Sequence, residues 1–320
     1  MDRLMGGGGR TIPALLVTLA VLLAVHPMLP GWAVNMVGLS LANGLAVLGL
    51  LVIMRAGLVS FGHGLYFGLG SYGAAMAATF LGVTDAFLMI AIGMASAALV
   101  AFVLGFLMAR YRGIFFALLN LAFSMLLYGL LVNSAVLGST DGFSMPIPSY
   151  LGYAPVDATS RVSFLLYALI CVLAFAAALV VHRYLQSTMG YIGEGIRENE
   201  VRVEYLGASV RRAIHIKYVI AAAITGLGGV LTVLLIGHVT PEDTVYWTKS
   251  GELVFVAILS GTGSVAAPFL GSMLFELVRT YALQYAPDLW QMLLGATLLA
   301  VIMFLPGGLW SVVRLARRKA

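Results

Sequence analysis

The chain has 320 residues, of which 61% are hydrophobic and 10% are charged, and its formal net charge at pH 7 is +5. Soluble domains contain about 25% charged residues, so this composition excludes an ordinary soluble protein and predicts an integral membrane protein. The hydrophobic residues form long runs and not short alternating strands, which predicts an all-α membrane fold and excludes a β-barrel. The positive charge is expected to report membrane topology, and no nucleic acid is expected as a partner.

Ten apolar runs, separated by glycine, proline and charged residues, predict about ten transmembrane helices in a single domain, residues 1–320. No small-residue cleavage site follows the first run, so it is expected to stay as a helix. A spanning helix needs about 20 apolar residues, and the eighth run is too short, so it is expected to be broken or re-entrant. The predicted segments are residues 11–27, 34–54, 59–81, 86–109, 114–137, 162–181, 218–237, 253–263, 269–283 and 290–304.

The lysines and arginines indicate which side of the membrane each loop occupies. With an even number of crossings, all but three of the 18 lie on the side of the two termini, and the exceptions are Arg161, Lys249 and Arg279. Because cytoplasmic loops are rich in Lys and Arg, both termini are predicted to be cytoplasmic. The longest outer loop is then about residues 138–160, and the longest cytoplasmic loop about residues 187–217.

The cytoplasmic loop at 187–217 holds the densest group of charges in the chain. Thr188 is the predicted N-cap of a helix there, and Gly207 is its predicted end. The segment is either a solvated connecting helix or a contact surface for a cytoplasmic partner. Its acidic residues precede basic residues by three or four positions, which favours ion pairs along a surface helix. The predicted pairs are Glu194 with Arg197 and Glu198 with Arg202.

Motifs for soluble chemistry do not occur in the sequence. No GxxxxGK[ST] is present, so the chain is not expected to bind ATP through a P-loop of its own. HExxH, CxxC and GxSxG are also missing and the five histidines are scattered, which argues against a metal site and a hydrolase. A GxGxxG at residues 68–73 lies inside a predicted membrane segment and not after a strand. The chain is therefore expected to be no enzyme and to bind no cofactor itself.

A glycine-rich stretch at residues 57–73 has two interpretations. Small residues let helices in a membrane approach closely, so the stretch can serve packing alone. Alternatively, a broken helix there shapes a translocation path. Polar, small or aromatic side chains on otherwise apolar segments are the candidates for that path. They are Asn43, Ser60, His63, Tyr66, Phe67 and Asn120.

Carboxylates within the membrane segments are few. Glu276 lies in the middle of a predicted segment, and Glu252 lies near the edge of another. Transporters that are coupled to protons or sodium usually carry buried carboxylates on the ion path. A single central carboxylate gives little support for such coupling, so the energy for transport is expected to come from another subunit.

Five segments, in this order, resemble the permeases of high-affinity branched-chain amino acid ABC importers, and the M-type subunit of that pair most closely. The likeness runs from about residue 35 to 310. It is specific for the family and less so for the substrate, because importers of urea, amides and aromatic acids share the architecture. The segments are RAGLVSFGHGLYFGLGSYGAA (55–75), YRGIFFALLNLAF (111–123), STDGF (139–143), IRENEVRVEYLG (196–207) and ILSGTGSVAAPFLG (258–271).

The resemblance implies an ABC importer permease fold in a bacterial inner membrane, surrounded by lipid. The chain would form half of a transmembrane dimer with a homologous H-type permease. Two cytoplasmic ABC ATPases would use ATP and Mg²⁺, and a periplasmic binding protein would deliver the substrate. The resemblance also places an ATPase-coupling helix within residues 193–207. Its contact residues would be Glu194, Gly195, Ile196, Arg197, Glu198, Asn199, Glu200 and Arg202.

Two alternatives stay open at this point. Within the same architecture, the substrate is a branched-chain or related amino acid, or else urea, an amide or an aromatic acid. In a different class, the chain is a stand-alone secondary transporter or facilitator, which would transport without any ATPase.

Overall fold

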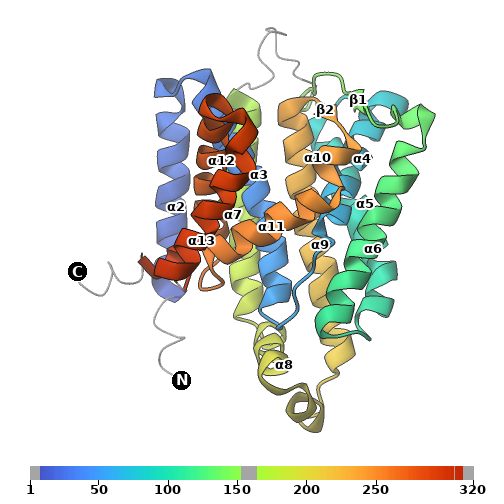
Figure 1. Ribbon diagram of the computed structural model, residues 1–320, viewed down its shortest axis with the longest axis vertical. Helices are drawn as coiled ribbons and strands as arrows, with labels where there is room; N and C mark the ends of the chain where they lie inside the picture. Colours follow the sequence, from blue (N-terminus) through green and yellow to red (C-terminus); the bar gives the residue numbers. More distant parts are fainter. Residues whose placement is uncertain (1–7, 153–163, 306, 313–320) are drawn as a thin grey trace.

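The computed structural model describes residues 8–152, 164–305 and 307–312, and they form a helical bundle (Figure 1). Two short strands, β1 (Phe143–Ser144) and β2 (His238–Val239), pair antiparallel at one end of it. The all-α prediction is therefore confirmed. The helices are α2 (Gly8–Val25), η1 (His26–Met28), α3 (Gly31–Met54), α4 (His63–Phe80), α5 (Ala86–Met108), α6 (Gly113–Val132), η2 (Ala135–Leu137), α7 (Phe164–Leu185), α8 (Thr188–Tyr205), α9 (Val210–Ile236), α10 (Pro241–Thr244), α11 (Trp247–Ser260), α12 (Ala267–Tyr285), η3 (Pro287–Leu289) and α13 (Trp290–Phe304).

Each predicted membrane segment overlaps a helix, but the helices differ in their ability to cross a bilayer. Among the described residues, six helices are long and apolar enough to do so: α3, α5, α6, α7, α9 and the stretch Pro287–Phe304. The number of crossings stays a prediction. Three parts of the predicted topology lie outside the described residues: the outer-loop residues 153–160, Arg161 with the start of the segment 162–181, and the basic residues Arg3, Arg314, Arg317, Arg318 and Lys319.

Two helices begin earlier than the hydrophobic pattern indicated. Helix α9 begins at Val210 and not at 218, because Ser209 Oγ accepts a hydrogen bond from the backbone N–H of Arg212 at 3.4 Å and caps the helix. Helix α11 begins at Trp247 and not at 253, so it contains Lys249 and Glu252. In both cases charged residues were assigned to a loop but lie in a helix that packs against protein.

Close glycine contacts hold the centre of the bundle together. Helix α9 lies at the centre and packs against α3, α4 and α5. A Cβ at Gly70 of α4 would overlap the backbone of Gly226 in α9, and a Cβ at Gly93 of α5 would lie 2.6 Å from the Gly70 carbonyl oxygen. Small residues therefore let three helix backbones meet. These contacts support the packing interpretation of the glycine-rich stretch.

Helices α4 and α11 both begin inside the bundle. In Figure 1 an irregular segment rises from the lower end of α3 to the start of α4, and α11 runs obliquely across the middle of the molecule. The backbone N–H of Gly64 donates to Ser250 Oγ at 2.9 Å, which joins the first turns of α4 and α11. Helix α11 has 14 residues, about 21 Å, so it is too short to cross the hydrocarbon core, as its short apolar run indicated.

The bundle has two distinct ends. Helix α8 projects from one end, while β1, β2 and α10 lie at the other (Figure 1). At the strand end, Asp85 caps α5 by accepting from the backbone N–H groups of Phe87 and Leu88, and it also accepts from Leu151 N at 2.7 Å. These bonds give the described part of the long outer loop a fixed position over the bundle.

Candidate functional site

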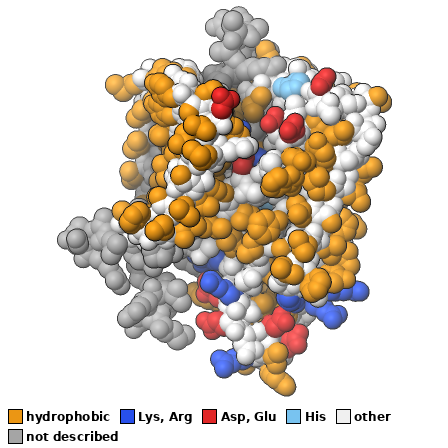
Figure 2. All heavy atoms as spheres, in the orientation of Figure 1, with side chains coloured by type: hydrophobic (Ala, Val, Ile, Leu, Met, Phe, Trp, Pro, Cys, Tyr) orange, Lys and Arg blue, Asp and Glu red, His pale blue; other side chains and the backbone are white. Residues whose placement is uncertain are grey.

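A cavity of about 530 Å³ opens at the end of the bundle that carries β2 and α10. Figure 2 shows acidic side chains around a hollow at this end. The cavity is lined by residues of α3, α9, β2, α10 and its N-cap, α11, α12 and α13, together with Ser71 of α4. They are Leu39, Asn43, Ser71, Thr232, Val233, Ile236, His238, Thr240, Glu242, Asp243, Thr244, Thr248, Lys249, Glu252, Glu276, Arg279, Thr280, Leu283, Trp290 and Gln291.

The floor of this cavity lies near the middle of the membrane. Asn43 follows the first residue of α3 by twelve positions, or about 18 Å along the helix axis. Glu276 is the central residue of α12. Because the hydrocarbon core is about 30 Å thick, a cavity that reaches these two residues extends about halfway across it.

Four charged side chains and one amide form a connected network on the floor. Asn43 Nδ2 donates to Glu276 Oε1 at 2.7 Å, and Lys249 Nζ donates to Asn43 Oδ1 at 3.1 Å. Glu252 Oε2 lies 3.5 Å from Lys249 Nζ and 3.8 Å from Arg279 Nη1. Lys249 and Glu276 are only 7% and 6% exposed. We refer to these five residues as the outer floor.

Each of the two cations, Lys249 and Arg279, also lies near an aromatic ring. Lys249 Nζ lies 4.6 Å from the ring centroid of Phe67, and the guanidinium carbon of Arg279 lies 5.6 Å from that of Trp290. Burying a charge costs several kcal/mol unless it is paired, and charges within membranes almost always face protein or a water-filled cavity. The outer floor contains two cations and two carboxylates, so it holds four charges at mid-membrane without a net charge.

A second polar group lies deeper, toward the α8 end. Tyr66 Oη donates to Tyr218 Oη at 2.6 Å, Tyr218 Oη donates to Asn120 Oδ1, and Asn120 Nδ2 donates to the carbonyl oxygen of Phe116 at 2.7 Å. His63 stacks edge-on against Tyr66, and neither of its ring nitrogens has a hydrogen-bond partner among the described residues. We refer to His63, Tyr66, Asn120 and Tyr218 as the inner cluster.

The six residues that were predicted to line a translocation path lie in two places, the outer floor and the α8 end of the bundle. Asn43 lines the cavity and Phe67 lies against Lys249 of the outer floor. The other four, Ser60, His63, Tyr66 and Asn120, are completely buried toward the α8 end. Whether substrate passes them stays a prediction.

The sequence reasoning did not include the four charged residues of the outer floor in the path. A signal was available, because α11 and α12 each carry opposite charges three positions apart. These are Lys249 with Glu252 and Glu276 with Arg279. Such pairs in two consecutive helices give a balanced set of charges, which packing gathers on the cavity floor.

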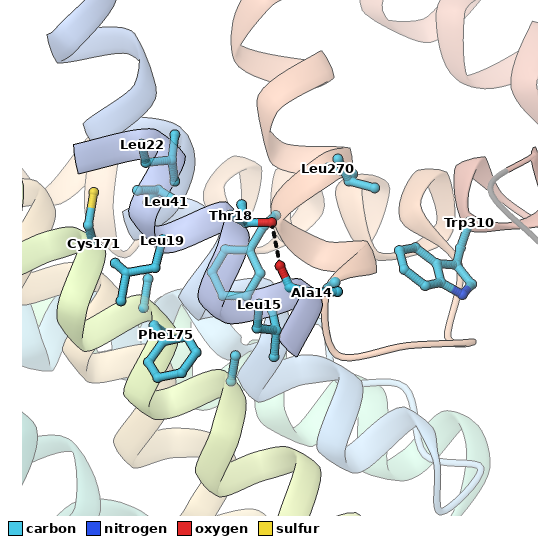
Figure 3. A pocket seen from close by; sticks show the side chains of 14 residues that line it. Ala14, Leu15, Thr18, Leu19, Leu22, Leu41, Cys171, Phe175, Leu270 and Trp310 are labelled. Carbon is cyan, nitrogen blue, oxygen red and sulfur yellow. Dashed lines mark hydrogen bonds between the residues drawn. The ribbon is translucent and has the colours of Figure 1, made fainter. Parts of the chain in front are cut away.

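A separate apolar pocket of about 290 Å³ lies between α2, α7 and the start of α12. Figure 3 shows its lining, with Leu15, Leu19 and Phe175 among the side chains. Its one hydroxyl, that of Thr18, already donates to the carbonyl oxygen of Ala14 at 2.9 Å. The described lining offers no charged group, so this pocket does not suit a charged or strongly polar ligand.

The charged loop forms helix α8, which is kinked. Ser187, and not Thr188, is the N-cap, and its Oγ accepts from Gly190 N at 3.4 Å. Asn199 has extended backbone angles (φ −163°, ψ 102°), and its Oδ1 accepts from Arg202 N at 3.0 Å, so it starts a second helical segment. Gly207, with φ +84°, follows the end of that segment as predicted.

The glutamates of α8 pair with other elements and not along their own helix. Glu194 lies 3.3 Å from Arg55 at the end of α3, and Glu200 lies 2.7 Å from Arg112 just before α6. The prediction of pairs within α8 was wrong: Glu194 pairs with Arg55 in place of Arg197, and the kink at Asn199 interrupts the helical spacing between Glu198 and Arg202. Burial lowers the pKa of the Arg55 guanidinium, and Glu194 opposes that change. These two ion pairs anchor α8 to the bundle.

The face of α8 that points away from the bundle combines charge with exposed apolar side chains. Ile196 is buried. Gly195 lies against Val203, and a Cβ added at Gly195 would be 3.1 Å from Cγ2 of Val203. Tyr205 and Leu206 are 88% and 80% exposed. Figure 2 shows hydrophobic side chains among charged ones at this end. The other exposed residues of this face are Arg197, Glu198, Asn199, Val201, Arg202 and Glu204.

Comparison with known proteins shows which chains are similar to this one. The family described as the permease component of the branched-chain amino acid transport system matches residues 32–302. The high-affinity branched-chain amino acid transport system permease protein LivM of Escherichia coli (strain K12) is 28% identical over 326 residues, which covers 93% of this chain and 75% of the relative. LivM of Salmonella typhimurium is 27% identical over 288 residues, covering 82% of this chain and 66% of the relative.

The second permease of that system is more distantly similar. LivH of Salmonella typhimurium is 24% identical over 269 residues, which covers 79% of this chain and 85% of the relative. No solved structure matches the chain.

Proposed function

The chain belongs to the family of permease components of branched-chain amino acid transport systems, and we propose that it forms half of the translocation path of an ATP-driven importer of branched-chain amino acids. The observation that carries this proposal is the cavity whose charged floor lies at mid-membrane. The family supports this function over a stand-alone transporter and over importers of urea, amides or aromatic acids.

The proposed orientation places the cavity mouth outside the cell and α8 in the cytoplasm of a bacterium. Acidic side chains at the cavity mouth, such as Glu242 and Asp243, and arginines at the α8 end, such as Arg112 and Arg202, support it. Ten crossings with both termini in the cytoplasm fit this charge distribution. The membrane would be the inner membrane, as expected from the sources of the relatives.

The proposed assembly contains a homologous second permease, two cytoplasmic ATPases that bind ATP and Mg²⁺, and a periplasmic binding protein. Similarity to both LivM and LivH supports the pairing of two permeases. The tip of α8 supports the ATPase contact, because Val201, Tyr205 and Leu206 are exposed beside Arg202 and Glu204. Exposed apolar residues with a charged rim are typical of a protein-binding surface.

Helix α3 offers a direct mechanical link between the two functional regions. Its last turn is followed by Arg55, which pairs with Glu194 of α8 and donates to the carbonyl oxygen of Thr262 at 3.1 Å. Its middle carries Asn43 of the outer floor. An ATPase that shifts α8 would thereby bias the position of Asn43, as coupling requires a contact that differs between two states.

Co-purification and uptake test the proposal. The tagged chain is expressed with the second permease and the ATPases, solubilised gently and reconstituted into liposomes, and the binding protein is added. We expect a P-loop ATPase and a second permease to co-purify, and leucine uptake to require ATP. Purification of the tagged chain alone, still active in liposomes without ATP, would contradict the proposal.

The α8 contact is tested by the double substitution Tyr205→Ala and Leu206→Ala. We expect the ATPase to be lost on purification, because the largest exposed apolar side chains of the tip are removed. A matched control is Leu99→Ala with Val103→Ala, two similarly exposed side chains on α5. The triple reversal Arg197→Glu, Glu198→Lys and Glu200→Lys should likewise uncouple the ATPase while the bundle folds. Normal assembly and uptake in both variants would exclude this contact.

A further inference from the structure

We propose that the outer floor binds the zwitterionic head group of an α-amino acid, with the carboxylate at Lys249 and Arg279 and the ammonium group at Glu276. The proposal rests on the proposed function, because it names the contacts that a transported amino acid makes on its way through this chain. Asn43 joins the two halves of this site through its hydrogen bonds to Lys249 and Glu276.

The role of Asn43 follows from the direction of its hydrogen bonds. Its oxygen accepts from Lys249 Nζ at 3.1 Å, and its nitrogen donates to Glu276 Oε1 at 2.7 Å. An amino acid head group offers the same functions, because its carboxylate accepts and its ammonium group donates. The carboxamide therefore satisfies a cation and an anion in the order in which a zwitterion would satisfy them. A bound head group replaces or extends these two bonds.

The carboxylate half has spare hydrogen-bond donors. Lys249 has three N–H donors, and its nearest oxygens are those of Asn43 at 3.1 Å and Glu252 at 3.5 Å. Arg279 has five donors, reaches Glu252 only at 3.8 Å, and its side chain is 30% exposed.

The ammonium half has a spare acceptor. Glu252 is shared between the two cations, whereas among the described residues Glu276 makes one hydrogen bond, from Asn43. A carboxylate can accept up to about four bonds, so Glu276 retains capacity for an ammonium group. Because the floor carries two charges of each sign, a neutral zwitterion enters without disturbing the balance. A simple anion or cation would leave a net charge at mid-membrane, where it is costly.

The remaining cavity wall is mostly polar, with one apolar part that can contact an aliphatic side chain. Leu39 of α3, Val233 and Ile236 of α9, and Leu283 of α12 line it above the floor. A head group fixed at the floor would direct its side chain toward these residues. The site can therefore hold an α-amino acid whose aliphatic side chain contacts these four residues.

Cysteine protection in the assembled transporter tests the site. Cys171, the only cysteine of the chain, is replaced by Ala, and Thr280→Cys then places a reporter thiol in the cavity. A charged, membrane-impermeant thiol reagent is applied from the cavity side. Leucine at ten times its dissociation constant should slow labelling about tenfold. The analogues 4-methylpentanoate, which lacks the ammonium group, and 3-methylbutylamine, which lacks the carboxylate, should not protect at that concentration.

Variants of Glu276 identify the ammonium contact. Glu276→Gln keeps an acceptor for Asn43 but removes the charge, and should raise the leucine concentration needed for protection about ten- to hundredfold. Glu276→Asp retains the charge and should protect better than Glu276→Gln. Co-purification of the partner subunits shows that each variant is folded. Thr140→Cys, exposed in the outer loop, should label equally with and without leucine.

The outcomes separate this proposal from the proposed function. If the wild-type complex imports leucine with ATP but leucine protects no reporter in the cavity, the head-group site is wrong and the function stands. Equal protection by leucine and either analogue, or an unchanged Glu276→Gln variant, also overturns the site. Failure of the wild-type complex to import leucine overturns the function itself.

Discussion

The outer floor and the inner cluster both contain polar side chains, but these side chains differ in their hydrogen-bond and ion-pair partners. The charges of the outer floor pair with one another beside an open cavity. The inner cluster is completely buried, and both ring nitrogens of His63 lack a partner among the described residues. Phe67, which contacts Lys249, and Tyr66, which bonds to Tyr218, are consecutive in α4. The open region and the closed one therefore meet within a single turn of α4.

The difference in hydrogen bonding also means a difference in free energy between the two regions. An unsatisfied buried polar atom costs about 1–3 kcal/mol, so the closed inner cluster carries a cost that hydration would remove. Phe67 and the hydrogen-bonded pair of Tyr66 and Tyr218 are buried between the cavity and the α8 end. Three substitutions test whether the outer floor and the inner cluster differ in this way, and the one with the largest expected effect comes first.

Lys249→Met should give the largest loss of stability. It removes the buried cation that pairs with Glu252 and that Asn43 links to Glu276, which we expect to cost about 3–5 kcal/mol. The double variant Lys249→Met with Glu276→Gln should recover part of that loss, because one uncompensated carboxylate is removed. Chemical unfolding of the purified complex measures both. An additive double variant would show that the two residues are not coupled and that the outer floor is not one network.

The sequence predicted the helical fold and the charged cytoplasmic element better than the outer floor. Long apolar runs located the helices, and Ser187 to Gly207 followed ordinary capping rules within one residue. Lys249 and Glu252 were missed because their helix is short and polar at its start, so hydropathy placed them in a loop. Asn43 was found as a polar residue on an apolar helix, but its bond to Glu276 joins residues that are 233 positions apart. Only packing brings them together.

Tyr218→Phe should have a smaller effect, confined to the inner cluster. It removes a hydroxyl that bonds to both Tyr66 and Asn120, so we expect a loss of about 1–3 kcal/mol. Leucine protection in the outer cavity should stay the same. Tyr285→Phe, at a tyrosine that is 76% exposed, is the matched control. A change in leucine protection equal to that of Glu276→Gln would show that the two polar regions form one site.

Arg112→Gln should have the smallest effect on stability. Its ion pair with Glu200 is partly exposed, with side chains 31% and 43% accessible, and such pairs contribute about 0.2–1 kcal/mol. Because Arg112 precedes α6, the helix that carries Asn120, we expect a clearer effect on coupling. The measurement is the ratio of leucine imported to ATP hydrolysed. A normal ratio would show that this anchor does not transmit movement from α8 to the inner cluster.

The most direct test of the central claim is an electron cryomicroscopy structure of the assembled transporter with leucine and without ATP. The account predicts density for the amino acid in the outer cavity, with its carboxylate beside Lys249 and its ammonium group beside Glu276. Leucine bound against Tyr66 and Asn120 with the outer cavity empty, or bound without touching this chain, would contradict it.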